Sequence, residues 1–280
     1  MIELRLPHGS LVKSGNRPLL MGIVNVTPDS FSDGGCFDGP KRGLDHALAL
    51  LDDGADLIDI GGESTRPGSA AVPDDEECRR VVPVVEALRR ARPGCIISVD
   101  TRKAAVAAAA LEAGCDIIND VSGLAYAPEI AGLAAASGAG LVLMHSPATP
   151  DVMQQPQFLQ YGDVVETVKS FLLAAAGQAR EAGVPAGRII LDVGIGFGKT
   201  LEQNLTLLRR LEEFGSLGYP LLVGHSRKRF IGELLRQSDP RQRDIGTVGI
   251  SLKLMERNCD ILRVHAVKLH REAMTAYAAG

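Results

Sequence analysis

Two polar, glycine-rich segments are the parts of this 280-residue sequence best suited to chemistry. The first reads NVTPDSFSDGG from Asn25 to Gly35, and the second reads GGESTRPG from Gly61 to Gly68. Each follows a short apolar run, and neither contains much that could fill a core. Polar loops that directly follow buried strands are where α/β proteins build active sites. We therefore interpret both segments as parts of one binding surface.

The elements that must position these segments alternate regularly along the chain. Short apolar runs predict eight strands, at Leu19–Asn25, Leu57–Gly61, Cys95–Asp100, Asp116–Asn119, Gly140–His145, Arg188–Asp192, Pro220–Gly224 and Asp260–His265. Amphipathic stretches predict helices at Arg42–Asp53, Asp74–Arg92, Arg102–Ala113, Pro128–Ser137, Asp163–Ala182, Leu201–Phe214, Phe230–Arg236, Asp244–Asn258 and Lys268–Ala278. Such alternation requires parallel strands with right-handed crossovers. Eight units favour a closed (β/α)8 TIM barrel over a doubly wound open sheet.

The first residues predict an N-terminal β-hairpin that covers the bottom of this barrel. Residues 2–6 and 11–13 are strand-like and flank His8-Gly9. The sequence contains no linker, low-complexity run or internal repeat, so a single domain over residues 1–280 is the simplest organisation.

The composition excludes several classes of function. A net charge of −4 gives no reason to expect nucleic acid or an anionic membrane as a partner. The five cysteines include no C-x-x-C pair, which argues against a disulfide framework and a structural zinc site. No signal peptide or bilayer-spanning run is apparent, so we expect a cytoplasmic location.

A TIM barrel places its active site at the carboxyl ends of the strands, and most of those ends are polar here. Asp100, Asn119, Asp192 and Lys228 would converge at the mouth from four strands. Their acceptors and donors suit a flat heterocycle with a guanidine-like edge. The alternative for Asp100 is that it only caps the following helix.

A second group of polar residues suits an anion. Arg66, Arg263 and His265 would clamp a phosphate or pyrophosphate, with Asn25 as a ligand of a hydrated Mg²⁺ ion. The alternative for His265 is a hydrogen-bonded core histidine, and we prefer that interpretation for His145 and His225. The run of cations from 227 to 229 directly follows a strand, which favours the mouth over a solvated surface.

The segment from Gly194 to Thr200, GIGFGKT, is not a nucleotide-binding loop. A P-loop needs glycine at position 193, where the sequence has valine, and the G-x-G-x-x-G spacing is also wrong. A flexible loop that lets Phe197 and the backbone approach a ligand is the better interpretation.

Seven motifs in the same order resemble dihydropteroate synthase, over the stretch from Leu19 to His265. They are NVTPDSFSDGG, GGESTRPG, SVDTRK (Ser98–Lys103), IIND (Ile117–Asp120), GIGFGK, SRK (Ser226–Lys228) and RVH (Arg263–His265). The resemblance implies condensation of 6-hydroxymethyl-7,8-dihydropterin pyrophosphate with p-aminobenzoate to 7,8-dihydropteroate and pyrophosphate. It also implies Mg²⁺ as cofactor, sulfonamides as competitors of the arylamine, and a homodimer.

The resemblance also assigns the site residues. The pterin would be held by Asp100, Asn119, Asp192 and Lys228. The pyrophosphate and Mg²⁺ would contact Asn25, Arg66, Arg263 and His265. The p-aminobenzoate side would be formed by Thr65, Phe31, Pro67, Phe197 and Ser226.

This sequence departs from the family pattern at Ser146, Val193, Arg229 and Ala266, where Met, Pro, Ser and Asp are usual. None of these positions carries a proposed catalytic group, although Ser146 would remove an apolar wall of the pterin pocket. Two alternatives remain within the same fold: a pterin-binding paralogue without condensation activity, and a methyltransferase that uses methyltetrahydrofolate. The two intact loop motifs and the anion clamp favour the synthase over both.

Overall fold

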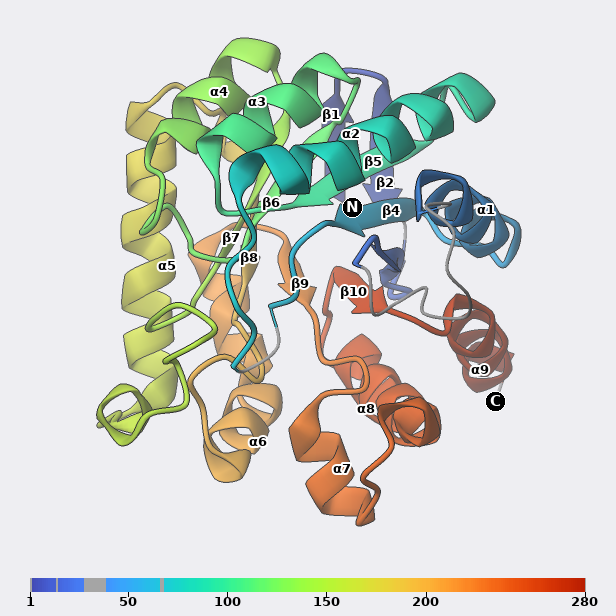
Figure 1. Cartoon of the computed structure of the whole chain (residues 1–280). Coiled ribbons are helices and arrows are strands. Elements are labelled where there is room, and N and C mark those ends of the chain that lie inside the picture. The colour runs from blue at the N-terminus through green and yellow to red at the C-terminus, as the bar shows by residue number, and fades with distance from the viewer. Residues whose placement is uncertain (1, 14, 28–38, 66–67, 280) are drawn as a thin grey trace.

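Eight parallel strands close into a barrel, as the sequence predicts (Figure 1). The computed structural model describes residues 2–13, 15–27, 39–65 and 68–279. The strands follow one another around the barrel in chain order, with β10 paired to both β3 and β9. They are β3 (Leu19–Asn25), β4 (Leu57–Gly61), β5 (Ile96–Asp100), β6 (Ile117–Asp120), β7 (Gly140–Met144), β8 (Ile189–Asp192), β9 (Leu221–Val223) and β10 (Ile261–Val264).

Helices surround this barrel and bury its outer surface. They are α1 (Gly39–Asp52), α2 (Asp74–Ala91), α3 (Ala104–Glu112), α4 (Glu129–Ser137), α5 (Val164–Glu181), α6 (Leu201–Arg209), α7 (Arg229–Leu235), α8 (Asp244–Glu256) and α9 (Val267–Ala279). The predicted helix Leu201–Phe214 is too long, because α6 ends at Arg209 and a 3-10 helix follows at Leu211–Leu217. Among the described residues, no helix is long and apolar enough to cross a membrane.

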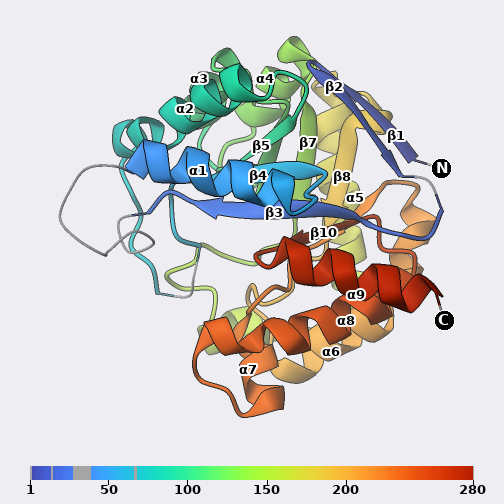
Figure 2. The same cartoon turned by 90° about the vertical axis from the view of Figure 1, so that its right-hand side faces the viewer.

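The predicted hairpin is present and lies at the end of the barrel where the strands begin (Figure 2). Its strands, β1 (Ile2–Leu6) and β2 (Gly9–Lys13), pair in antiparallel fashion. Leu4, Leu6 and Leu11 pack against inward-facing residues from all eight barrel strands. Burial of these apolar side chains closes the bottom of the barrel.

The hairpin is also held by ionic contacts. Asp116, fully buried, accepts hydrogen bonds from the backbone N–H of His8 at 3.0 Å and from Arg89 at 2.6 Å. Lys13 donates to Asp260 at 2.7 Å. Charged partners in both barrel and helices therefore fix the hairpin against the strand beginnings.

Candidate active site

The guanidinium of Arg263 lies between two carboxylates at the opposite, carboxyl end of the barrel. Its Nε donates to Asp59 Oδ2 at 2.6 Å, and its Nη2 donates to Asp100 Oδ2 at 2.8 Å. Asp100 therefore points to the barrel axis, and the capping alternative is wrong, because α3 has no side-chain cap. Charge-assisted bonds of this kind fix the orientation of the guanidinium.

Asp59 is a site residue that the sequence analysis missed. It is fully buried inside β4, where Oδ1 accepts a hydrogen bond from Ser98 at 2.6 Å and Oδ2 accepts one from Asn119 at 3.2 Å. The signal was available, since an aspartate in the middle of an apolar strand is costly to bury without partners. Side chains two positions apart share a face, so Asp59 points inward like Gly61.

Two glycines add no side chain to the mouth above this charged layer. A Cβ atom on Gly61 would lie 3.5 Å from Asp100 Cβ and 3.9 Å from Asn25 Oδ1. One on Gly224 would lie 3.7 Å from both Asp192 Oδ2 and Arg263 Cδ. Larger residues at these positions would occupy the space between the polar groups, where a ligand has room to bind.

Asp192 and Lys228 stand on another side of the mouth, next to the loop 194–199. Asp192 is buried, and its Oδ1 accepts a hydrogen bond from the backbone N–H of Gly194 at 2.8 Å. The Lys228 ammonium donates to the carbonyl of Ile195 and lies 4.3 Å from the centre of the Phe197 ring. An ammonium over an aromatic ring is attracted by the ring's negative face.

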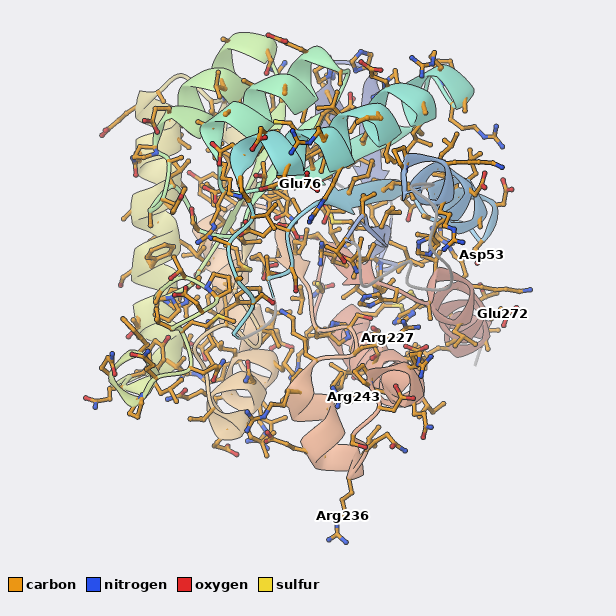
Figure 3. The ribbon with its side chains drawn as sticks, viewed as in Figure 1. Asp53, Glu76, Arg227, Arg236, Arg243 and Glu272 are labelled. Carbon is orange, nitrogen blue, oxygen red and sulfur yellow. The ribbon has the colours of Figure 1, made fainter. Side chains whose placement is uncertain are left out.

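Of the three cations at 227–229, only Lys228 faces the mouth, so that prediction is wrong for its two neighbours. Arg227 has a positive φ of 59° and turns away to form a two-pronged ion pair with Asp244, at 2.7 and 2.8 Å. Its carbonyl accepts a hydrogen bond from Arg243, and both arginines lie where α7 meets α8 (Figure 3). Arg229 is exposed and pairs with Glu233 at 2.7 Å.

His265 and Ser226 contact each other beside Arg263. The Ser226 hydroxyl and His265 Nδ1 are 2.9 Å apart, and the backbone N–H of His265 donates to the same hydroxyl at 3.2 Å. Asn25, half-buried at the end of β3, sits opposite Gly61 in the sheet register. His265, Ser226 and Asn25 therefore lie at the mouth, where the sequence predicts them.

The pKa values of the site groups are shifted mainly by burial. Burial raises the pKa of Asp100 to about 7; Arg263 opposes the shift and Asp59 adds to it. Burial also raises the pKa of Asp192, against the effect of Lys228. Burial lowers the pKa of Lys228 to about 7, while Asp192 acts in the opposite direction.

Three predicted site residues, Phe31, Arg66 and Pro67, lie outside the described residues. Thr65 is described and is half-buried. Glu63, two residues before Thr65, accepts a hydrogen bond at Oε2 from the backbone N–H of Val72, at 2.9 Å. The same oxygen accepts one from Lys103, at 2.6 Å.

The two histidines assigned to the core, His145 and His225, are indeed buried. His145 packs edge-on against Phe171, with ring centres 4.9 Å apart. His225 Nε2 lies 3.0 Å from Ser251 Oγ and 3.1 Å from the carbonyl of Thr247.

The four departures from the family pattern leave the described charged groups in place. Ser146 donates to the carbonyl of Ala148 at 2.7 Å, and Val193 is fully buried. Ala266 contributes only its carbonyl to His270, at 2.7 Å.

Size does not identify the site when two of the cavities among the described residues are compared. The larger, of about 510 Å³, lies near the hairpin and is lined by residues such as Glu3, Tyr219 and Asn258. The smaller, of about 190 Å³, lies at the mouth beside Phe197 and Ser146. We place the site at the mouth, because the charged groups converge there. Within the described ranges, no cluster of three or more His, Cys, Asp or Glu side chains could hold a metal ion.

Comparison with known proteins identifies the family. The family model described as "Pterin binding enzyme" matches residues 21–265. A dihydropteroate synthase from Synechocystis sp. is 47% identical over 94% of this chain and 90% of its own length. The dihydropteroate synthase of Yersinia pestis, solved with a sulfonamide drug, superposes with a TM-score of 0.91 at 43% identity, covering 99% and 98% of the two chains. The enzyme of Xanthomonas albilineans, in complex with 7,8-dihydropteroate, gives a TM-score of 0.83 at 43% identity over 94% and 93%.

Proposed function

The chain belongs to the dihydropteroate synthase family of pterin-binding enzymes, and from this premise we propose how its side chains divide the work. The enzyme joins 6-hydroxymethyl-7,8-dihydropterin pyrophosphate to p-aminobenzoate and gives 7,8-dihydropteroate and pyrophosphate. The observation that carries our assignment of roles is the guanidinium of Arg263 fixed between Asp59 and Asp100, next to the side-chain-free positions Gly61 and Gly224.

We assign the pterin to Asp100, Asn119, Asp192 and Lys228. The carboxylates accept hydrogen bonds from the ring's N–H groups, and such bonds offset the desolvation of a buried carboxylate. The Arg263 guanidinium, held flat by its two partners, offers its face to the ring. Phe197 stands at the edge toward the arylamine, on the side of Lys228.

We assign the pyrophosphate to the cationic rim. Arg263 and His265 contact its oxygens, together with Arg66, which lies outside the described residues. Asn25 fits a Mg²⁺ ion that arrives with the substrate phosphates, because it supplies one neutral oxygen and the described residues form no carboxylate cage around it. The ion, when bound, neutralises part of the charge on the leaving group.

The bond changes follow from this arrangement. The carbon–oxygen bond to pyrophosphate breaks, and its electron pair leaves with the pyrophosphate. The cation on the methylene carbon, stabilised by the pterin, is trapped by the lone pair of the arylamine nitrogen, which then loses a proton. Positioned charges stabilise this transition state without a covalent intermediate on the protein.

We place p-aminobenzoate between Thr65, Phe197 and Ser226, with Phe31 and Pro67 from the undescribed segments. The sulfonamide bound to the Yersinia pestis relative supports competition at this side. A cytoplasmic location also stays a prediction.

We further propose that two copies associate through α7 and α8. Leu234, Leu235 and Ile245 expose 47%, 44% and 76% of their surface there, and contiguous exposed apolar residues mark interaction sites. Sedimentation should show a dimer for the natural chain and a monomer for Ile245→Asp. A natural chain that sediments as a monomer would contradict this association.

The decisive experiment for the proposed function measures pyrophosphate release with each substrate alone and with both. We expect release only when pterin pyrophosphate and p-aminobenzoate are both present, with one 7,8-dihydropteroate formed per pyrophosphate. Release without p-aminobenzoate would indicate a hydrolase, and no release would indicate a pterin-binding paralogue.

A further inference from the structure

A buried ammonium lies just behind the site and has no part in the reaction described above. Lys199 is 4% exposed, and each of its three N–H groups has an acceptor. These acceptors are the carbonyl of Gly194 at 2.8 Å, the carbonyl of Phe197 at 2.9 Å and Nδ1 of His145 at 3.0 Å. Burying a lysine so completely is costly unless its donors are satisfied in this way.

The loop 194–199 wraps around this ammonium in a conformation that needs glycine. Gly194, Gly196 and Gly198 all have positive φ, at 68°, 83° and 54°. A Cβ on Gly194 would lie 1.9 Å from the carbonyl oxygen of His145, and one on Gly198 would lie 2.2 Å from Pro147. The prediction of a glycine-rich loop that approaches a ligand therefore needs one addition, because the glycines also let the backbone close around Lys199.

The outer side of the same loop touches two groups that we assign to the pterin. Its first N–H, from Gly194, donates to Asp192 at 2.8 Å. The carbonyl of Ile195 accepts a hydrogen bond from the ammonium of Lys228. The same ammonium lies over the Phe197 ring, 4.3 Å from the ring centre. One short loop therefore contacts both lysines. Ile195 and the Phe197 ring contact Lys228, and the carbonyls of Gly194 and Phe197 bind Lys199.

We propose that Lys199 is a positioning residue for the reaction, which holds the loop 194–199 in the shape that orients Lys228 and Asp192 toward the pterin. This inference rests on the proposed function, because it assumes that Lys228 and Asp192 bind that substrate. Lys199 does not touch the mouth itself, so its effect passes through the loop carbonyls and the Phe197 ring.

Charge adds to the mechanical link. Burial lowers the pKa of Lys199 to about 7, and the nearby Lys228 lowers it further, while Asp192 acts in the opposite direction. His145 also faces Lys199. Burial lowers the pKa of His145 to about 2 and keeps the imidazole neutral, so its Nδ1 can accept a hydrogen bond from Lys199. Lys228 in turn faces Asp192, Arg263 and Asp100. Because the two ammonium groups repel each other, a neutral residue at position 199 should favour the charged form of Lys228.

The test compares Lys199→Gln, which keeps two neutral donors, with Lys199→Met, which keeps only the apolar shape. The matched control is Lys169→Gln on the outer side of α5, where the lysine pairs with Glu166 at 3.0 Å. Each variant of the full chain is assayed for kcat and KM from pH 5 to 10, and its folded fraction is followed by circular dichroism.

We expect kcat/KM for the pterin substrate to fall ~10²-fold in Lys199→Met and ~10-fold in Lys199→Gln, as for a displaced electrostatic group. The alkaline limb of the pH profile should move to higher pH in both, and neither quantity should change in Lys169→Gln. Wild-type rates and profiles in folded Lys199 variants would overturn the proposal. So would a loss that only follows the unfolded fraction, with an unchanged pH profile.

Gly196→Ala tests the step between the loop and Lys228, and it can be measured even if Lys199→Met does not fold. A Cβ there would lie 2.8 Å from Cδ of Lys228 and must displace that side chain, while Lys199 stays intact. We expect a rate loss of ~10-fold or more. Wild-type kinetics in Gly196→Ala would refute positioning by this loop. Pyrophosphate release by the natural enzyme tests the proposed function independently of all these variants.

Discussion

Arg263 donates its Nε–H to the carboxylate of Asp59 at 2.6 Å, at a position 204 residues away in sequence and fully buried inside the barrel. We expect Asp59→Asn to lower both activity and stability, because the guanidinium loses one of two buried negative partners. Removing one member of a buried ion pair typically costs about 3 kcal/mol or more of unfolding free energy. Urea unfolding and kcat/KM measure the two effects, with the exposed Asp53→Asn as control. Equal stability of Asp59→Asn and the natural enzyme would contradict the electrostatic role.

Lys228→Ala and Asp192→Asn should each lose activity while the protein stays folded. Both groups stand at the carboxyl end of the barrel, where function is kept apart from stability. The expected loss is ~10²-fold or more in kcat, as for one preorganised electrostatic group. Steady-state kinetics beside thermal unfolding curves check this, with Arg209→Ala on the surface of α6 as control. Near-wild-type turnover in either variant would remove that residue from the pterin site.

The contribution of His225 to stability should decline in acid, relative to a variant that cannot titrate at this position. Burial lowers its pKa from 6.5 to about 3, so below pH 6.5 the unfolded chain binds a proton that the folded chain rejects. Its contribution is therefore complete above pH 6.5 and declines as pH falls toward 3, by about 1.4 kcal/mol per unit.

The stability difference between the natural chain and His225→Gln isolates this group from Asp100, whose raised pKa acts in the opposite direction. Unfolding free energies from urea titrations at pH 8, 6 and 5 should show the advantage of the natural chain shrinking below pH 6.5. A constant difference across that range would show that His225 does not titrate as its burial requires.

Activity should require a divalent cation that binds together with the pyrophosphate. Asn25 offers one neutral oxygen, and a cage of carboxylates is absent from the described part of the chain, so Mg²⁺ should come with the substrate phosphates. Turnover should stop in EDTA and return with excess Mg²⁺, and calorimetry should detect binding only when pyrophosphate is present. Tight Mg²⁺ binding to the free protein would argue for a different metal site.

The periodic part of this sequence predicts the fold well because barrel strands are buried on both faces. Apolar runs such as Leu19–Asn25 and Leu57–Gly61 match β3 and β4 in full. The ends of the shorter strands differ from the prediction by at most one residue, because pairing partners decide where a ladder stops. The strand ends also predict Asp100, Asn119 and Asp192, since residue type and position both point to the mouth.

Two features of the site depend on geometry that spacing does not reveal. Asp59 lies one layer below the strand end, so a search limited to the last residue of each strand passes over it. Arg227 has a positive φ and is bonded to Asp244 and Thr247, and no local sequence pattern predicts that it turns away from Lys228. Tertiary partners decide both cases.

The hairpin across the strand beginnings has a consequence for how material passes through the enzyme. Leu4, Leu6 and Leu11 pack into the lower end of the barrel, so the described residues close that end of its axis. Both reactants must therefore enter, and both products must leave, through the mouth at the carboxyl ends of the strands. Both products must leave the mouth before new substrates can bind. An enzyme that received the product by direct transfer would have to dock at this end of the barrel.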